Sequence, residues 1–240
     1  MGLRNPAPLL FLMRWIERKD HLFLEGAPGV TVLVTGRSLS MPAGEEPEAA
    51  KLRAYVEATG LRPLFVTGMR QVHGARFEEM KGGPDRVIPS CDGLLTGSPG
   101  LALVVRTADC LPIVAVGAGG RRLGVAHAGW RGIRAGVADR LVRSMGPGPL
   151  EIAIGPGIGP CCYEVGPEFE GWFEGCFSRR EGRLFLDLVS AVSGQIERAG
   201  VPRGRIHAAP GCTACSAGRF HSFRREGASA GRMLTVAMIS

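Results

Sequence analysis

The chain has 240 residues, of which 45% are hydrophobic, and its formal net charge is +7. This length suits one large domain or two small ones, and the apolar content is enough for a sizeable core. The early apolar run at 6–13 is too short to span a bilayer and no small-residue cleavage site follows it, so we expect neither a membrane segment nor a secretory signal. Seven cysteines, an odd number, indicate a reducing cytoplasmic setting with free or metal-binding thiols.

Arginine dominates the basic residues. Only Lys19, Lys51 and Lys81 are lysines among the 29 basic side chains. Arginine suits bidentate capture of phosphate or carboxylate. The arginines are scattered and no basic stripe with interleaved aromatic residues is visible, so we do not expect a nucleic-acid partner.

The sequence reads as mixed strands and helices without strict alternation. Residues 1–28 form an amino-terminal extension of uncertain structure, and 41–61 predicts a loop followed by an amphipathic helix. Runs rich in Val, Ile, Leu and Ala predict strands within 29–36, 63–74, 101–110, 111–117, 121–129, 150–155, 205–211 and 232–240. Several are almost continuously apolar, which predicts sheets covered on both faces.

Three further helices are predicted in the second half of the chain. Apolar residues recur every four positions across 132–145 and at similar intervals across 187–199, and a shorter helix is predicted at 165–177. Gly200 is placed to end the second of these. The pattern predicts a single α+β domain, 1–240, with mixed sheets covered by helices.

Three side chains with metal-binding or nucleophilic chemistry are predicted at strand ends: His73, Cys110 and His127. Neighbouring strands of one sheet would bring these ends together. Zinc accepts three such ligands in catalytic sites and keeps a fourth position for water or substrate, and copper uses the same donors. The alternatives are hydrogen-bonded core histidines and a buried cysteine that acts as a small hydrophobe.

The neighbours of these side chains suit a pocket. The segment AHAGWRG surrounds His127 with small residues, Trp130 could form a pocket wall, and Arg131 adds a guanidinium where a helix begins. Asp109 could orient a ligand or a water molecule, or cap a turn.

Several later motifs stay ambiguous. GPGIGPCCYEVG, at 155–166, could form a backbone nest for phosphate or a rigid turn. The pair Cys212 and Cys215 could serve redox chemistry, metal binding or packing. The arginine-rich segment 218–232 could be a solvated loop, or Arg224 and Arg225 could clamp a phosphate or carboxylate.

Together these segments resemble the bacterial laccase-domain family, also called YfiH-like or polyphenol-oxidase-like. The resemblance covers roughly residues 64 to 240 through QVHG, DGLLTGSPGLALVVRTADCLPIVAV, GVAHAGWRG, AIGPGIGPCCYEVG, CTAC and FHSFRREGASAGRM. The amino-terminal quarter departs from the family, because VTGRSLSMPAG lacks the glycine-rich stretch and the LNL segment that follow the family's arginine. Arg37 corresponds to that arginine.

The resemblance implies a YfiH-like, cysteine-hydrolase-like architecture and a zinc or copper ion held by His73, Cys110 and His127. It also implies phosphorolysis of purine nucleosides (adenosine, inosine and methylthioadenosine) and deamination of adenosine. The metal would activate water for deamination, and Asp109 joins the metal-binding residues as a catalytic candidate. The expected partners are a purine nucleoside and phosphate, and we expect a monomer or homodimer.

Phosphorolysis also needs an anion site beside the ribose. Arg37, Arg131, Arg224 and Arg225 could supply it electrostatically.

A laccase reaction is not expected as the main activity, because five histidines cannot fill several histidine-rich copper sites. Two rival functions remain open. One is a metal-free cysteine hydrolase with Cys110 as nucleophile and a histidine, His127 or His73, as base. The other is a non-catalytic protein of cell-envelope quality control.

Overall fold

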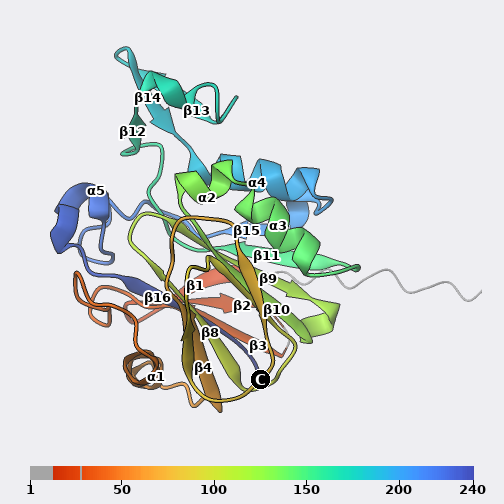
Figure 1. The fold of residues 1–240 in the computed structure, drawn as a ribbon. Coiled ribbons are helices and arrows are strands. Elements are labelled where there is room, and N and C mark those ends of the chain that lie inside the picture. The colour runs from red at the N-terminus through yellow and green to blue at the C-terminus, as the bar shows by residue number, and fades with distance from the viewer. Residues whose placement is uncertain (1–12, 28) are drawn as a thin grey trace, which may run out of the picture.

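Two large β-sheets stack face to face and carry helices on their outer faces (Figure 1). The structure is a computed structural model that describes residues 13–27 and 29–240. Nearly all of the apolar run at 6–13, and with it the first part of the 1–28 extension, lies outside those residues. Within the two described ranges, none of the helices is both long enough and apolar enough to cross a bilayer.

The first sheet has seven strands and the second has six. In order across the first sheet these are β1 (Arg14–Arg18), β2 (His21–Glu25), β3 (Val30–Val34), β16 (Met233–Ile239), β8 (Leu101–Thr107), β4 (Phe65–Met69) and β6 (Arg86–Ile88). Across the second they are β15 (Ile206–Ala208), β11 (Leu150–Ile154), β9 (Leu111–Gly117), β10 (Arg122–Ala128), β7 (Gly93–Thr96) and β5 (Phe77–Met80). Both sheets mix parallel and antiparallel pairs, which confirms the predicted α+β class with mixed sheets.

Alternating side chains of the strands explain the layers. In β8, Leu103 and Val105 face the core between the sheets, whereas Ala102 and Val104 face outward into a separate cluster. Helix α1 (Ala49–Ala58) covers that outer face. The strand is therefore apolar on both sides, as its nearly continuous hydrophobic run predicts.

The second sheet is covered in the same way. Val114 of β9 points between the sheets, and Ile113 points outward beneath α3 (Val137–Ser144) and α4 (Leu188–Arg198). Figure 1 shows α1 on one side of the stacked sheets and α2–α4 on the other.

The helix predicted at 132–145 is two helices, so that prediction is wrong in its continuity. Helix α2 (Trp130–Arg134) ends before Gly136, whose φ of 81° is left-handed, and α3 begins after it. A left-handed residue breaks the path of a right-handed helix, and glycine adopts it without steric cost. The predicted apolar stripe is still the buried face, through Ile133, Val137 and Leu141.

The short helix predicted at 165–177 is also wrong. A single 3-10 turn, Pro167–Phe169, is followed by turns through Gly175 and by strand β13 (Phe177–Arg180). With β14 (Arg183–Leu186) and β12 (Glu164–Val165), β13 makes a small sheet that projects beside α4 (Figure 1). Glycine and proline in this segment oppose a regular helix.

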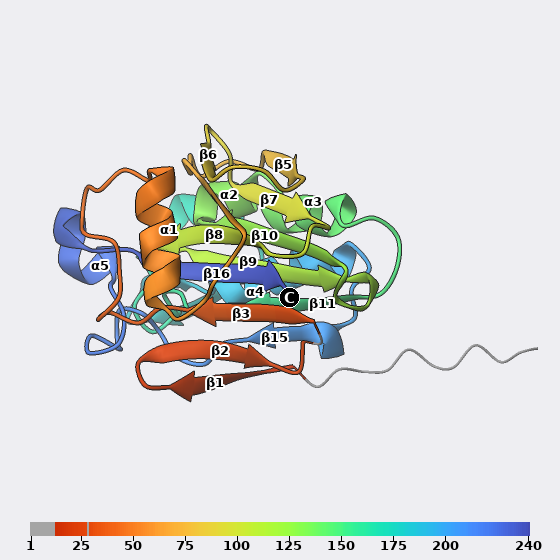
Figure 2. The ribbon, with the colours of Figure 1, turned by 90° about the horizontal axis from the view of Figure 1, so that it is seen from below.

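The described part of the amino-terminal extension is a hairpin. Strands β1 and β2 pair antiparallel and continue the seven-stranded sheet beyond β3 (Figure 2). The indole Nε1 of Trp15 donates to the carbonyl of His207 at 3.0 Å, which ties the hairpin to β15 in the other sheet.

Candidate active site

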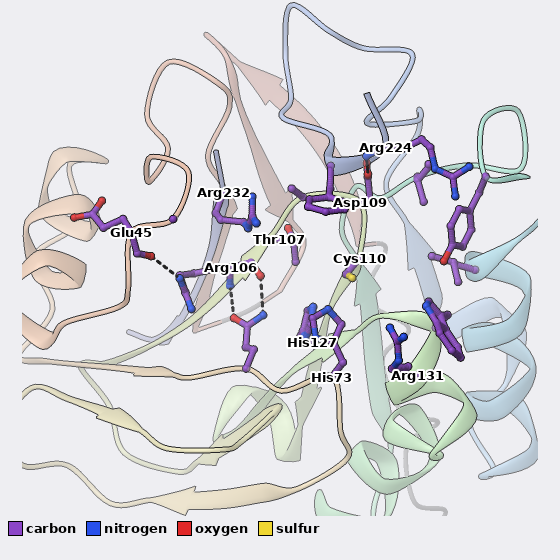
Figure 3. A pocket seen from close by; sticks show the side chains of 18 of the residues that line it. Glu45, His73, Arg106, Thr107, Asp109, Cys110, His127, Arg131, Arg224 and Arg232 are labelled. Atoms are coloured by element: carbon purple, nitrogen blue, oxygen red, sulfur yellow. Dashed lines mark hydrogen bonds between the residues drawn. The ribbon is translucent and has the colours of Figure 1, made fainter. Parts of the chain in front are cut away.

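The side chains of His73, Cys110 and His127 converge at one end of the stacked sheets (Figure 3). One nitrogen or sulfur atom from each lies within 4.8 Å of the other two. The expectation that neighbouring strands of one sheet bring all three together is correct for Cys110 and His127 but wrong for His73. Cys110 directly precedes β9, which pairs with β10, the strand that carries His127. His73 follows β4 in the first sheet, next to β8, the strand that leads to Cys110. The cluster therefore forms between the sheets.

Asp92 holds both histidines in place. Its carboxylate accepts hydrogen bonds from the backbone N–H groups of Val72 (3.1 Å), His73 (2.9 Å) and Gly74 (2.8 Å). These three donors fix the turn in which His73 adopts a left-handed φ of 60°. The same carboxylate pairs with Nδ1 of His127 at 2.8 Å, and the Asp92 carbonyl accepts from the His127 N–H at 2.8 Å.

Gly129 allows the cluster to be this compact. A Cβ atom on this residue would lie 2.8 Å from the sulfur of Cys110 and 2.9 Å from Cδ2 of His73. Both distances are too short for nonbonded carbon contacts, so a side chain here would displace the cluster. The backbone φ of −81° is ordinary, so the requirement for glycine is one of space alone.

The cluster couples a thiol to an imidazole. Burial raises the pKa of Cys110, but the charge and hydrogen bonds of His127 and the hydrogen bond from His73 outweigh it and lower the pKa to about 6. Burial lowers the pKa of His127, whereas the neighbouring Cys110 and Asp92 raise it to about 9. Each group favours the charged form of the other, which is typical of a metal-ligating or nucleophilic thiolate.

The three side chains fit a metal ion. Two imidazoles and one thiol are donors that zinc and copper both accept. Because Asp92 engages Nδ1 of His127, the other ring nitrogen is left for a ligand, which is the arrangement that orients histidine ligands in metal sites. The donor chemistry and this carboxylate support therefore suit a metal that is bound by three protein ligands.

Asp109 is placed to hold loops together. It has a left-handed φ of 84°, and its two carboxylate oxygens accept from Oγ1 of Thr213 and from the N–H of Arg224, each at 2.6 Å. Its carbonyl accepts from Ile158 N–H at 2.9 Å. These contacts join the Cys110 turn to two later loops and correspond to the capping role considered for this residue.

A cavity of about 570 Å³ opens onto the cluster. Besides the three cluster residues, its lining includes Glu45, Gln71, Arg106, Thr107, Asp109, Trp130, Arg131, Tyr163, Leu188, Phe223, Arg224 and Arg232. Of the arginines expected at the site, Arg131 and Arg224 line this pocket, and Arg37 and Arg225 are not among the lining residues.

Arg37 and Arg225 instead stabilise the wall. The guanidinium of Arg37 pairs with Glu226 at 2.7 Å, and that of Arg225 donates to the carbonyls of Thr213 (2.8 Å) and Ala214 (2.7 Å). Arg225 also pairs with Glu226.

Sequence reasoning missed two pocket arginines. Arg106, the sixth residue of β8, faces the cavity beside Arg232, which directly precedes β16, the neighbouring strand (Figure 3). Gln71 binds the backbone of Arg106 twice at 2.8 Å, through its amide nitrogen and its amide oxygen. A signal was present, because Arg106 stands four residues before Cys110 in the segment DGLLTGSPGLALVVRTADCLPIVAV.

Sequence reasoning also missed Asp92. It stands in the segment CDGLL without a distinctive spacing to either histidine.

A pocket lined by a thiol–imidazole cluster and several guanidinium groups has the composition of an enzyme active site. The chain belongs to the family described as multi-copper polyphenol oxidoreductase laccase, whose model matches residues 35–240. This confirms the resemblance drawn from the motifs.

Curated relatives and a solved structure agree with this assignment. Purine nucleoside phosphorylase YlmD of Geobacillus stearothermophilus is 36% identical over 187 residues, covering 68% of each chain. A purine nucleoside phosphorylase of Xylella fastidiosa (strain 9a5c) is 35% identical over 236 residues, covering 90% of each. The crystal structure of YlmD from Geobacillus stearothermophilus matches with a TM-score of 0.83 at 27% identity, covering 95% of this chain and 99% of that one.

The multi-copper part of the family's description is not matched by the histidines of this chain, all five of which the structure describes. Only His73 and His127 lie together, with ring centroids 4.7 Å apart. His207 pairs with Glu151 and His221 with Glu226, each at 2.9 Å. A cluster of several copper ions needs more imidazoles in one place than this arrangement provides.

Proposed function

We propose that this chain is a purine nucleoside phosphorylase that also deaminates adenosine, with adenosine, inosine and methylthioadenosine as substrates. One observation carries the proposal: a single pocket of about 570 Å³ combines the His73–Cys110–His127 cluster with several guanidinium groups. Ligands of nucleoside size bind in cavities of this volume. The relatives named purine nucleoside phosphorylase support the same reaction.

Arg106 and Arg232 are the groups we assign to phosphate. Among the described residues, the buried Nε of Arg106 has no hydrogen-bond partner, and one of its terminal nitrogens donates only weakly to the Glu45 carbonyl, at 3.3 Å. Burial lowers the pKa of Arg106, the nearby Glu46 carboxylate raises it, and the charge of Arg232 lowers it again, so that the pKa stays below its ordinary value and the two guanidinium groups repel one another. An anion bound between the two guanidinium groups would offset both the burial of the Arg106 charge and the repulsion between Arg106 and Arg232.

Arg131 and Arg224 lie at the other end of the pocket, beyond the cluster (Figure 3). Both terminal nitrogens of Arg224 already donate to the Glu164 carbonyl at 3.0 Å. Arg131 lies over the ring of Trp130, 4.1 Å from its centroid. This end therefore presents flat surfaces suited to a purine base, and the phosphate role first expected for these two arginines becomes the competing assignment.

In phosphorolysis, a phosphate oxygen bonds to the anomeric carbon while the bond from that carbon to the base nitrogen breaks. The arginines hold the attacking anion and offset its charge. A zinc or copper ion held by His73, Cys110 and His127 would supply an activated water for deamination at the purine carbon that bears the amine. Asp92 keeps His127 oriented for that role.

Chromatographic analysis of products from adenosine with phosphate tests the proposal. We expect adenine from phosphorolysis and inosine from deamination, and loss of deamination in Cys110→Ala. Because inosine is itself a proposed substrate, its phosphorolysis product, hypoxanthine, is scored as well, and the proposal fails if metal-loaded wild-type protein yields none of adenine, inosine and hypoxanthine. Hydrolysis by metal-free protein would support the cysteine-hydrolase alternative, and absence of all turnover would support a non-catalytic role.

The phosphate assignment has its own test. Loss of one charged hydrogen bond costs about 1.5–3 kcal/mol, so Arg106→Gln should raise KM for phosphate roughly 10- to 100-fold and leave KM for the nucleoside nearly unchanged. Arg179→Gln is the control, because Arg179 is exposed on β13 of the small sheet and pairs with Glu170. If Arg224→Gln raises KM for phosphate and Arg106→Gln does not, the competing assignment holds.

We further propose that the enzyme works in the cytoplasm without nucleic acid, as a monomer or homodimer. Many of its arginines are paired with carboxylates, such as Arg14 with Glu25 and Arg122 with Glu79. A DNA or RNA affinity that falls steeply with salt would contradict the absence of a nucleic-acid partner.

A further inference from the structure

Four cysteines outside the pocket cluster converge from two loops: Cys161, Cys162, Cys212 and Cys215. Their sulfur atoms all lie within 4.8 Å of one another. The sulfur of Cys215 lies 3.5 Å from that of Cys161 and 3.3 Å from that of Cys162. The two loops thus bring together the Gly-Pro-rich turn and the CTAC motif, neither of which the proposed function explains.

The spacing suits four thiolates around one ion. Sulfur ligands about 2.3 Å from a tetrahedral zinc lie about 3.8 Å from one another, close to the distances seen here. A disulfide bond would need about 2.05 Å between two sulfurs, and all four cysteines are free thiols. A set of four sulfur donors selects zinc or iron among the common metals.

The backbone holds the two loops in register. Gly157 and Cys212 form a bridge between the loops, and the N–H of Thr213 donates to the Gly157 carbonyl at 3.0 Å. The N–H of Gly159 donates to the sulfur of Cys212 at 3.2 Å, an interaction that favours a thiolate. Backbone hydrogen bonds of this kind, which fix the ligand-bearing loops and donate to a ligand sulfur, also surround the ligands in structural metal sites.

Positive charge also lies next to the cluster. Arg180 donates to the carbonyls of Pro160 (2.6 Å) and Cys161 (3.2 Å). Arg225 donates to the Ala214 carbonyl at 2.7 Å, next to Cys215. Zinc with four thiolates carries a net charge of −2, which two neighbouring guanidinium groups would offset.

We propose that Cys161, Cys162, Cys212 and Cys215 bind a structural zinc ion that braces the wall of the active site. The first loop continues into Tyr163, which lines the pocket, and the second carries Thr213, which binds Asp109. The metal would therefore clamp the two loops that support the Cys110 turn. Four protein ligands close the coordination shell, so this site has no open position for substrate.

The metal content of variants tests this site separately from the pocket cluster. The starting protein is Cys110→Ala, in which the pocket cluster lacks its thiol, purified under reducing conditions and reconstituted with zinc. We expect one zinc per chain. Adding Cys215→Ser should remove most of it, whereas adding Cys176→Ser, a cysteine outside both clusters, should not. The outcome is independent of whether the enzyme acts on nucleosides.

Two results would overturn the proposal: Cys110→Ala without bound zinc, or the Cys110→Ala/Cys215→Ser protein retaining a full equivalent. A second measurement covers the case in which the double variant does not fold. Chelation of zinc from Cys110→Ala should lower its Tm, and one added equivalent should restore it, because a metal bound only by the folded state stabilises that state. Cobalt in place of zinc should give thiolate-to-cobalt charge-transfer absorption, and its absence would also contradict the proposal.

Discussion

Asp92 is a fully buried carboxylate on which the geometry of the pocket cluster depends. Its contacts with the 72–74 turn and with the ring of His127 join the turn after β4 of the first sheet to β10 of the second. Burial raises the pKa of Asp92, but the hydrogen bond from His127 and those from the backbone outweigh it, and the pKa stays below its usual range. The positions of His73 and His127 therefore both depend on the ionised carboxylate of Asp92.

Replacing Asp92 with Asn should weaken metal binding at the pocket cluster roughly 10- to 100-fold, because the amide cannot accept from His127 and all the backbone donors at once. A competitive titration with a chromogenic chelator would measure this. Asp139→Asn, on the exposed face of α3, is the matched control. Unchanged affinity in Asp92→Asn would contradict this role.

Gly129→Ala should prevent the cluster from binding metal while the protein stays folded. The new methyl group would lie 2.8 Å from the Cys110 sulfur, so the thiol or His73 must move. Metal analysis together with circular dichroism would detect the effect. Gly204→Ala, where a Cβ meets nothing within 4 Å, should retain the metal, and equal metal content in both variants would refute the steric argument.

Among single residues, the chemistry of the side chain decided what the sequence could reveal. His73, Cys110 and His127 were predictable because few residue types ligate metals and each lies near the end of an apolar run. Asp92 was not, because it is one of 22 acidic residues and its role arises only from tertiary contacts. Arg225 had the right chemistry for phosphate, but its donors are taken by backbone carbonyls.

At the level of elements, the short helix α5 (Phe223–Glu226) is anchored by its last residue. The Glu226 carboxylate pairs with Arg37 at 2.7 Å, with Nδ1 of His221 at 2.9 Å, and with Arg225. Burial raises the pKa of Glu226, but these partners outweigh it and lower the pKa to about 2. The folded protein thus favours the ionised carboxylate.

Glu226→Gln should lower the free energy of unfolding by about 1–3 kcal/mol at neutral pH. Because the pKa is depressed in the folded state, the contribution is complete above the ordinary value of 4.5 and is lost as the pH falls toward 2. Urea unfolding curves at several pH values should show the wild type and the variant converging over this range. The exposed Glu174→Gln should track the wild type throughout, and a constant gap for Glu226→Gln would argue against this linkage.

The strand and helix predictions succeeded where periodicity was strong. The helix expected at 187–199 is α4, with Asp187 accepting from the Ser190 N–H at 3.0 Å as its N-cap. The prediction of one continuous helix at 132–145 failed because a glycine inside an apolar stripe does not by itself reveal that its φ is left-handed. Short strands such as β5 and β6 escaped prediction because their few residues lack a clear period.

Across the whole molecule, the apolar core between the two sheets joins the two layers. Leu103 is fully buried there, whereas Leu64 is 69% exposed just before β4. Leu103→Ala should cost about 2–5 kcal/mol of unfolding free energy, and Leu64→Ala should change it by less than about 0.5 kcal/mol. Chemical denaturation would measure both, and similar losses would contradict the layered description of the core.

The position of β16 between β3 and β8 affects how the chain folds during its synthesis. Thr107 ends β8 long before Met233 begins the strand that pairs with it. At a synthesis rate of about 5–20 residues per second, a nascent chain leaves that hydrophobic edge without its neighbour for roughly ten seconds. During this interval the edge is open to pairing with other chains, so the yield of folded protein in a cell should depend on factors that shield it on the ribosome.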